Sequence, residues 1–490
     1  MDFAQADGTG DQISAHVWRT SAVVVIGSIM SILDTTIVNV ALATLSRELH
    51  STISEIQWVV TGYMLSLAAV IPVSGWAARR FGAKQVYLVS VVLFTMGSAL
   101  CGLATSTTEL ILFRVLQGVG GGMILPVGQL MMAEAAGPKR MGRVMSIVAV
   151  PAMLAPILGP TIGGLIIQNT SWRWIFYVNV PIGVIAVATA LRYLPTIKPQ
   201  KTDKLDVLGL ILMATGLPLI TYGLAEIGVT GGFTSVKVIV PIILGIVLVA
   251  AFVLHALRIP KPLLDMRLYR RATFASASFA MFCLGAALFG GMILLPLYWQ
   301  GVRLESVVDT GLLVAPQGLG AAFAMPIAGK LSDRYGGGGL ALFGVTLCTV
   351  ATIPFGLIGA HTSVVWLSFA MFVRGIGIGF GFLPAMTAAF ASLERSELSS
   401  ATPQLNVLQR VGGSIGTAVL AVVLQRALAG AHTPSAAAAA YGTAFWVSAG
   451  LTAAAIIPCV ILLRAERKAR ARKGSATPPS EETLAEAIAA

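Results

Sequence analysis

Charged residues are scarce in this chain of 490 residues. Asp, Glu, Lys and Arg together make up 11% of it, whereas a soluble protein carries about 25%. Hydrophobic residues make up 56%, and the mean hydropathy is +0.84. The lack of charge excludes a soluble globular protein, because so much apolar surface has to lie in lipid.

Cysteine and histidine are few as well, which argues against metal and redox chemistry. The four cysteines stand far apart inside apolar runs, without the paired spacing of a zinc site or the density of a disulfide scaffold. The five histidines lie at the ends of apolar runs or between them, and no nucleophile and base pair is visible beside them. The phosphate-binding patterns GxxxxGKS and GxxxxGKT are missing. We therefore expect neither an enzyme nor a bound cofactor.

What the sequence does have is a series of long apolar runs. A helix that crosses about 30 Å of hydrocarbon needs roughly 20 apolar residues, and fourteen such runs are present. The predicted spans are 18–41, 55–77, 85–105, 110–132, 144–168, 175–194, 206–226, 237–257, 273–299, 308–329, 338–359, 363–391, 402–426 and 441–463. Acidic residues rather than a cationic start precede the first run, so we interpret it as a retained span and not as a cleaved signal peptide.

Lysine and arginine gather on one side of these spans. That side holds Arg79, Arg80 and Lys84 after the second span, further clusters after later even-numbered spans, and the basic run 464–473. Because cytoplasmic loops are enriched in these residues, both termini are predicted to be cytoplasmic in a multi-pass protein of the bacterial inner membrane. The net charge of +12 thus reflects topology, and we expect no nucleic-acid partner.

Two segments recur in the second half of the chain. PVSGWAARRFGAK (72–84) is echoed by PIAGKLSDRYGGG (326–338), and FRVLQGVGGGMILP (113–126) by VRGIGIGFGFLP (373–384). A single match would be ordinary for glycine-rich helices, but two matches in order indicate a transporter built from two helix bundles around a midplane site. We predict an all-α membrane protein with two pseudo-symmetric six-helix bundles and two inserted helices. The predicted parts are a tail (1–16), the first bundle (17–200), the inserted pair (201–262), the second bundle (263–464) and a basic, polar tail (465–490).

In several stretches the chain resembles the major facilitator superfamily, and within it the fourteen-helix drug:proton antiporter branch of multidrug efflux permeases. The stretches are LDTTIVNVAL (33–42), the segment after the second span, LILFRVLQGVGGG (110–122), LAPILGPTIGG (154–164), WRWIFYVNVPIG (172–183) and LQRVGGSIGTA (408–418). The resemblance covers essentially the whole chain. It implies transport by alternating access, driven by the proton gradient. It also implies an antiporter motif that favours export, formed by Gly159, Pro160, Gly163 and Gly164.

The loop expected after the second span is a candidate gate. The candidate gate residues are Gly75, Arg80 and Gly82 in the first copy and Gly329, Asp333 and Arg334 in the second. Gly329 and Arg334 stand at the positions that match Gly75 and Arg80. The family usually has an acidic residue where this chain has Arg79, whereas the second copy keeps Asp333. The first bundle is therefore expected to close differently, and a solvated turn that only carries positive charge is the alternative for its basic residues.

Charges inside a span cost about 2.5–3.5 kcal/mol each, so they are functional candidates. The sequence places one carboxylate, Asp34, well inside a span, together with Arg114, Arg374 and Arg410. At 1.5 Å per residue, Asp34 lies about 21 Å from the cytoplasmic side and Arg114 about 8 Å from the outer side, nearly the same depth in a core about 30 Å thick. We expect Asp34 and Arg114 to pair and to couple proton binding to movement. A static ion pair between the first and fourth spans is the alternative.

Polar residues in the spans are candidates for a substrate cavity, although hydrogen bonds between helices are their commoner role. They are Asn39, Gln117, Arg374, Gln409 and Arg410. The function predicted is proton-coupled export of small amphipathic or cationic drugs or metabolites by a monomer, with substrate, protons and membrane lipids as partners. A dedicated exporter of one metabolite or lipid is the alternative, and a membrane sensor that transports nothing is a remote one.

Overall fold

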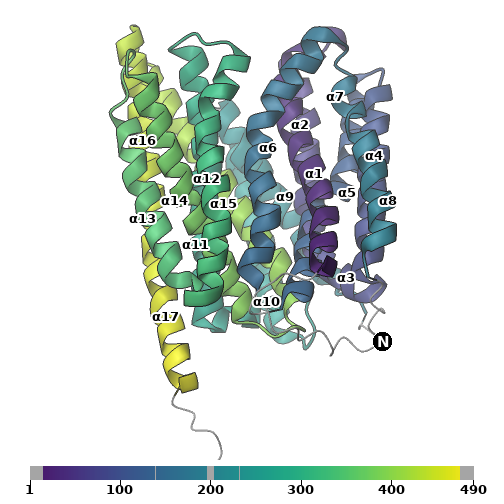
Figure 1. Ribbon diagram of the computed structural model, residues 1–490. Coiled ribbons are helices and arrows are strands. Elements are labelled where there is room, and N and C mark those ends of the chain that lie inside the picture. Colours follow the sequence, from purple (N-terminus) through teal and green to yellow (C-terminus); the bar gives the residue numbers. More distant parts are fainter. Residues whose placement is uncertain (1–14, 138–139, 196–203, 231, 475–490) are drawn as a thin grey trace, which may run out of the picture.

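Long, roughly parallel helices form the whole molecule (Figure 1). The structure is a computed structural model, and it describes residues 15–137, 140–195, 204–230 and 232–474. Nearly all of the predicted N-terminal tail and most of the predicted C-terminal tail lie outside the described residues. Helix α17 continues the last span to Gly474, so the first residues of the predicted C-terminal tail are helical.

The described helices supply the predicted spans. The helices are α1 (Ala15–Glu48), α2 (Ile53–Val70), η1 (Ile71–Val73), α3 (Ser74–Phe81), α4 (Ala83–Leu103), α5 (Thr107–Ala136), α6 (Met141–Asn169), α7 (Trp174–Tyr177), α8 (Asn179–Tyr193), α9 (Val207–Thr230), α10 (Val236–Arg258), η2 (Met266–Arg270), α11 (Ala272–Gly301), α12 (Val307–Tyr335), α13 (Gly337–Gly356), α14 (Val364–Ala391), α15 (Leu398–Leu428), α16 (Pro434–Ala454) and α17 (Ile456–Gly474). Among the residues that the structure describes, thirteen segments are long and apolar enough to cross a membrane, and α6, with 29 residues, is the remaining long helix. The prediction of fourteen helices is confirmed.

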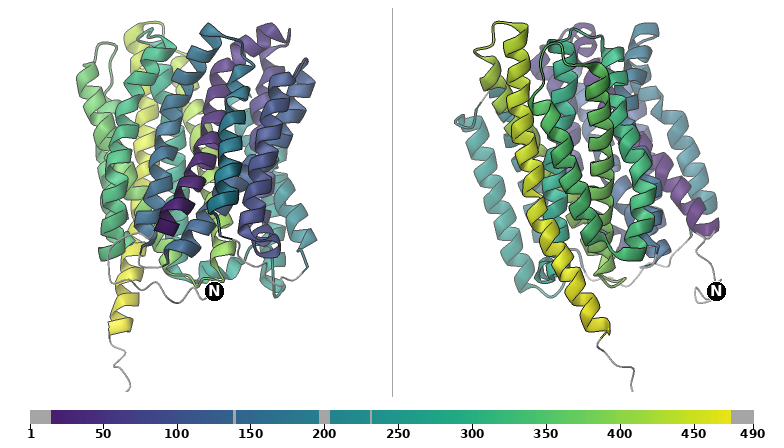
Figure 2. Two further views of the ribbon diagram at one scale, coloured as in Figure 1. Left: turned by 45° about the vertical axis from the view of Figure 1, so that its right-hand side comes forward. Right: turned by 60° about the vertical axis from the view of Figure 1, so that its left-hand side comes forward.

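The helices pack as two bundles with the same internal pairing. In the first bundle α1 packs on α6, while α2 and α4 pack on α5. In the second bundle α11 packs on α15, while α12 and α13 pack on α14. The inserted helices α9 and α10 pack on each other, and α9 also contacts α2 and α15, so the pair lies outside the bundles along their junction (Figure 2). The predicted pseudo-symmetric architecture is confirmed.

The inserted pair is fastened by Asp206, the residue before α9. Its carboxylate accepts hydrogen bonds from the N–H groups of Gly209 (2.8 Å) and Leu263 (3.2 Å) and lies 2.8 Å from Nε2 of His255. Burial raises the pKa of Asp206, but these hydrogen bonds outweigh burial and hold the pKa below its ordinary value. These interactions of the Asp206 carboxylate therefore stabilise the fold at neutral pH, and their contribution is lost only as the pH falls through the lowered pKa.

The segment expected as a loop after the second span is mostly helical. Residues 74–81 form α3, and the second copy lies inside α12. The chain turns only at Gly82 (φ 91°) and Gly336 (φ 90°), the matching glycines of the repeat. A side chain disfavours such φ values, so these glycines permit the sharp turn into α4 and α13. The expectation of a loop was wrong because the residue that makes the turn, Gly82, stands near the end of the segment, and the residues before it continue as a helix.

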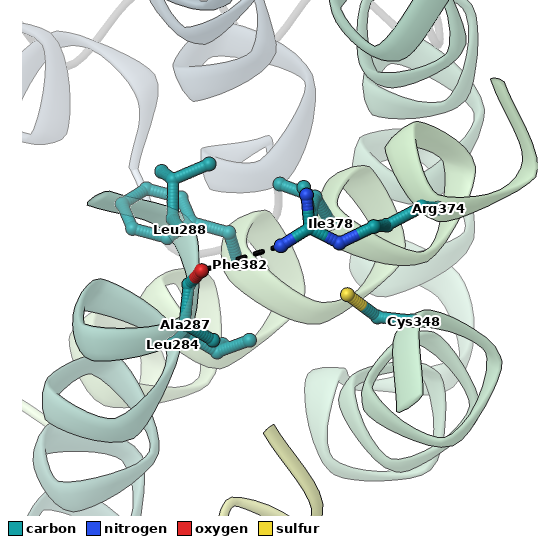
Figure 3. A pocket seen from close by; sticks show the side chains of 7 residues that line it. All are labelled: Leu284, Ala287, Leu288, Cys348, Arg374, Ile378 and Phe382. Carbon is teal, nitrogen blue, oxygen red and sulfur yellow. Dashed lines mark hydrogen bonds between the residues drawn. The ribbon is translucent and has the colours of Figure 1, made fainter. Parts of the chain in front are cut away.

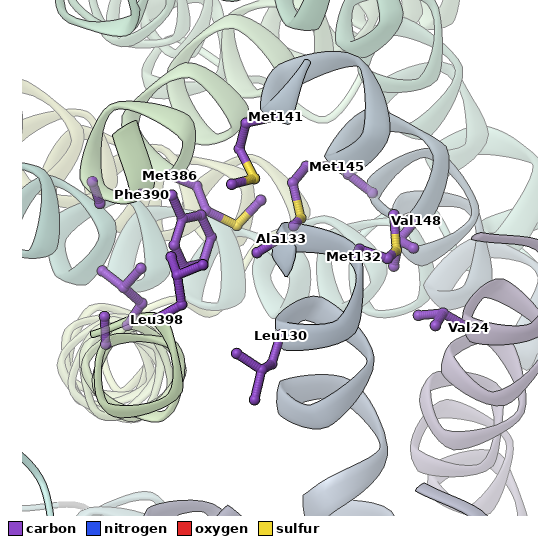
Figure 4. Packing of buried hydrophobic residues seen from close by; sticks show 14 of the residues in the cluster. Val24, Leu130, Met132, Ala133, Met141, Met145, Val148, Met386, Phe390 and Leu398 are labelled. Atoms are coloured by element: carbon purple, nitrogen blue, oxygen red, sulfur yellow. The ribbon is translucent and has the colours of Figure 1, made fainter. Parts of the chain in front are cut away.

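A methionine-rich core joins the bundles at the end that holds Arg79, Arg143 and Arg334, called the basic end below and lowest in Figure 1. Methionines of α5 and α6 share this core with Met386 and Phe390 of α14 (Figure 4). Toward the opposite end the buried apolar residues form separate clusters, one within each bundle. The two bundles are thus sealed together at the basic end.

Glycines allow the bundles to approach closely at this seal. A Cβ on Gly142 of α6 would collide with the carbonyl oxygen of Gly329 in α12, and a Cβ on Gly329 would collide with that of Gly142. Gly75 of α3 packs in the same way against the carbonyl of Ser399 in α15. Backbone atoms cannot move aside as a flexible side chain does, so these positions require glycine for the closed arrangement.

We predict that Gly142→Ala opens the basic end, whereas Gly164→Ala on the same helix leaves it closed. The first change adds a methyl group against backbone, while Gly164 has nothing within 4 Å of its Cβ direction. The check is the alkylation rate of a cysteine placed at Met386 in a background without the native cysteines. Faster alkylation in Gly142→Ala alone is expected, and equal rates in both variants would contradict the seal.

Candidate functional site: a buried ion pair in the first bundle

Asp34 and Arg114 form an ion pair inside the first bundle. Nη1 of Arg114 on α5 lies 2.6 Å from Oδ2 of Asp34 on α1, and the two side chains are 1% and 0% exposed. Asp34 is the only fully buried carboxylate among the described residues. The pair expected from helix depths is therefore present.

Two amides complete the surroundings of Asp34. Nε2 of Gln117 donates to Oδ1 at 2.8 Å, and Nδ2 of Asn179, at the start of α8, donates to the same oxygen at 2.9 Å. Asn179 also donates to the hydroxyl of Ser98 on α4 at 3.0 Å. Every partner of the carboxylate is a donor, so the pocket fits an acceptor in its charged form.

Arg114 is held as tightly as its partner. Its Nε donates to the carbonyl of Val59 on α2 at 3.2 Å, and its Nη1 donates to Oε1 of Gln117 at 2.7 Å. The guanidinium carbon lies 3.9 Å from the centre of the Tyr63 ring, within range of a cation–π contact. The network thus links α1, α2, α5 and α8. A change in the charge of Asp34 therefore alters hydrogen bonds to three other helices of the bundle.

Asn179 was missed by the sequence reasoning, although it stands in the stretch 172–183 that carries the family resemblance. It begins a helix next to a break in the sixth span, where α7 ends and α8 starts. No charge marks the position, and an asparagine at a helix start commonly caps the helix. The signal that was available is its place one residue before an apolar, proline-containing run.

The predicted antiporter motif lies one turn beyond this network. Gly159 and Gly163 of α6 pack against Thr36 and Ile37 of α1, where a Cβ would collide with or crowd the neighbouring atoms. Gly164 has no neighbour within 4 Å of its Cβ direction, and Pro160 lies within the same helix. The motif therefore brings α6 against α1 within the first bundle, close to Asp34.

The predicted gate residues separate into two groups. Asp333 at the end of α12 accepts hydrogen bonds from the N–H groups of Gly142 (2.7 Å) and Arg143 (3.1 Å) in the first turn of α6, where the helix dipole favours a negative charge. Arg79 of α3 donates to the hydroxyl of Ser399 in α15. These two contacts cross between the bundles. Arg80 and Arg334 are exposed and make no such contact among the described residues.

The candidate cavity residues differ in their surroundings. Gln117 belongs to the Asp34 network, and Asn39 is exposed on α1. Gln409 and Arg410 are partly buried on α15, whereas Arg374 is fully buried in the second bundle. Asp34 and Arg374 are therefore the centres of two polar networks, and Gln117 belongs to the first of them.

Two repeated bundles with a buried charge pair describe a secondary transporter. The chain belongs to the Major Facilitator Superfamily, whose model matches residues 24–417. It is thus a transporter and not an enzyme.

Several known proteins are similar to the chain over most of its length. A multidrug resistance protein B homolog of Mycobacterium tuberculosis (strain ATCC 25618 / H37Rv) is 40% identical over 417 residues, 84% of this chain and 77% of the relative. The lincomycin resistance protein LmrB of Bacillus subtilis (strain 168) is 30% identical over 390 residues, 79% of this chain and 81% of the relative. The crystal structure of the human organic anion transporter MFSD10 (TETRAN) superposes with a TM-score of 0.65 at 14% identity, covering 91% of this chain and 99% of that one, and so supports the fold.

We predict that Asp34→Asn and Arg114→Gln each destabilise the protein by about 3 kcal/mol, because each leaves one buried charge without its partner. The double variant is expected to be more stable than the sum of the single changes implies, since it removes both charges. Thermal unfolding in detergent at one pH, followed by tryptophan fluorescence, measures the effect. Additive losses in the double variant would mean that the two side chains do not stabilise each other.

Proposed function

We propose that the protein is a proton-coupled exporter of small amphipathic or cationic molecules. The observation that carries the proposal is the isolated carboxylate of Asp34, fully buried and held by three donors on two other helices. An intramembrane carboxylate of this kind can take up a proton only if its partners release it. Proton binding at Asp34 is thereby linked to the arrangement of the helices.

The basic end is proposed to be the cytoplasmic end. Positive residues concentrate in its loops, as expected for the cytoplasmic side of a bacterial inner-membrane protein. In the arrangement described above, the bundles are sealed at that end by the methionine core and by the contacts of Asp333 and Arg79. This state is therefore closed to the cytoplasm, and protons would reach Asp34 from outside.

In the proposed cycle a proton from outside neutralises Asp34 and weakens its pairing with Arg114. The freed helices α1 and α5 shift, and α6 follows because its glycines pack against α1. The first turn of α6 also donates hydrogen bonds to Asp333 of the second bundle, so this movement strains the seal at the basic end. The bundles then open to the cytoplasm, where a cationic substrate displaces the proton and carries the carboxylate back toward the closed state. Each step uses residues already in contact.

The substrate class is proposed from charge and from the relatives. In the proposed cycle a proton and a cationic substrate compete for the one buried carboxylate, so the first bundle suits a monovalent cation or a neutral amphipathic molecule. Relatives that are 30% and 40% identical are named for lincomycin resistance and multidrug resistance, which supports export of drugs. A dedicated exporter of one metabolite or lipid uses the same machinery with a narrower pocket and is the second candidate.

We predict that purified protein in liposomes moves a monovalent lipophilic dye in the direction opposite to the flow of protons down an imposed gradient, and that Asp34→Asn does not. Asp309→Asn, an exposed acid at the start of α12, is the matched control and should transport normally. Asp34→Glu should keep part of the activity because it retains an acid. The assay runs below the melting temperature of each variant, with dye binding measured in parallel. Equal gradient-driven transport by Asp34→Asn and the native protein would refute coupling at this residue.

The single buried acid also predicts selectivity by charge. Transport of a monovalent dye should exceed that of a divalent dye of matched shape, because the second positive charge has no buried partner in the described part of the chain. Initial rates at equal dye concentration provide the measurement. Faster movement of the divalent dye would show that the substrate site lies elsewhere.

A further inference from the structure

Arg374 is the other fully buried arginine among the described residues. It lies on α14 and donates only to neutral groups, namely Oγ1 of Thr352 (3.2 Å), Oε1 of Gln317 (2.5 Å) and the carbonyl of Ala287 (3.3 Å). Figure 3 shows its guanidinium directed toward α11, with the thiol of Cys348 beside it. No described carboxylate forms an ion pair with it.

The repeat places Arg374 where Arg114 stands in the first bundle. Arg114 on α5 contacts α1 and α2, and Arg374 on α14 contacts the corresponding helices α11 and α12. Cys101 of α4 lies in the network of Arg114, and Cys348 of the matching helix α13 lines the cavity at Arg374. The two arginines therefore occupy corresponding places in the two bundles, and the charge of their surroundings differs.

The difference is the carboxylate. Asp34 stands in the twentieth position of α1, counted from Ala15, and the twentieth position of α11, counted from Ala272, is Gly291. A Cβ on Gly291 would collide with Nη2 of Arg374, so this glycine faces the guanidinium as Asp34 faces Arg114. The second bundle thus keeps the cation and has no side chain of opposite charge. A buried charge without compensation is costly.

A cavity opens beside the unpaired guanidinium. Apart from Arg374, its lining is the apolar side chains of α11 and α14 and the thiol of Cys348 (Figure 3). The open volume is about 10 Å³, close to the lower limit for one water-sized particle. Such a space has room for one particle of about this size, such as a single ion or one oxygen of a carboxylate group, and its only charge is positive.

We propose that Arg374 is the core of a binding site for one small monovalent anion, which takes the part that Asp34 plays in the first bundle. The chemistry is that of a halide ion or of a single carboxylate group, which pairs with the guanidinium in a dry, apolar lining. A free inorganic ion and the acidic group of a substrate are the two sources of this chemistry. The site does not depend on the proposed export function, because binding is measured without transport.

The test is the melting temperature of the purified, full-length protein in sodium chloride, sodium formate and sodium gluconate at equal ionic strength. Gluconate is too large for the cavity and serves as the reference anion. We expect a saturable rise of a few degrees in chloride or in formate, and its loss in Arg374→Gln. Arg303→Gln is the matched control, because Arg303 also lies in the second bundle, donates to the backbone carbonyls of Ala360 and Thr362, and is remote from the cavity lining.

A second pair of variants decides the matter even if Arg374→Gln does not fold. Gly291→Asp supplies a tethered carboxylate at the guanidinium, and Gly291→Asn displaces the guanidinium equally without a charge. The proposal predicts that the Asp variant melts higher than the Asn variant in gluconate and no longer responds to chloride or formate. A stronger response of the native protein to chloride identifies an inorganic ion, and a stronger response to formate identifies a carboxylate ligand. Equal melting in all three salts would overturn the proposal.

Discussion

Burial of a single carboxylate in the first bundle is the constraint on which the arrangement of the molecule depends. Inside a membrane a charge must be paired, and Asp34 is paired with Arg114 at 2.6 Å. The donors that satisfy this pair come from α5 and α8, while Arg114 is steadied by α2. The glycines of α6 then pack on α1 a turn away from Asp34. One ionisable group is thereby connected to the helices that form the seal at the basic end.

The two bundles share a fold but not their electrostatics. The first holds a complete ion pair, and the second holds Arg374 at the equivalent position with Gly291 where the acid would be. The contacts that each bundle makes with the other at the basic end differ as well. Asp333 of the second bundle binds the N-terminus of α6, whereas Arg79 of the first donates to a serine hydroxyl. The two bundles thus have the same helix arrangement, and a few side chains in each bundle determine its chemistry.

Hydropathy and charge were sufficient to predict the fourteen helices, because lipid imposes a length and a polarity on every span. The two repeated segments then predicted the two-bundle arrangement and the inserted pair. Helix depth also predicted the contact between Asp34 and Arg114, since only two opposite charges lie at similar depth in neighbouring spans. The neutral partners could not be predicted. Asn179 and Ser98 carry no charge, and their role depends on the break between α7 and α8. The helical form of the segment before Gly82 was missed because its polar residues are typical of loops.

The central claim is that Asp34 exchanges a proton for substrate. The most direct measurement is the proton release that accompanies binding of a monovalent lipophilic cation to the purified protein, in weakly buffered solution acid enough to protonate Asp34 beforehand. The account predicts that the native protein releases protons as the cation binds and that Asp34→Asn binds it without release. Equal release by both proteins, or cation binding to the native protein with no release at all, would contradict the account.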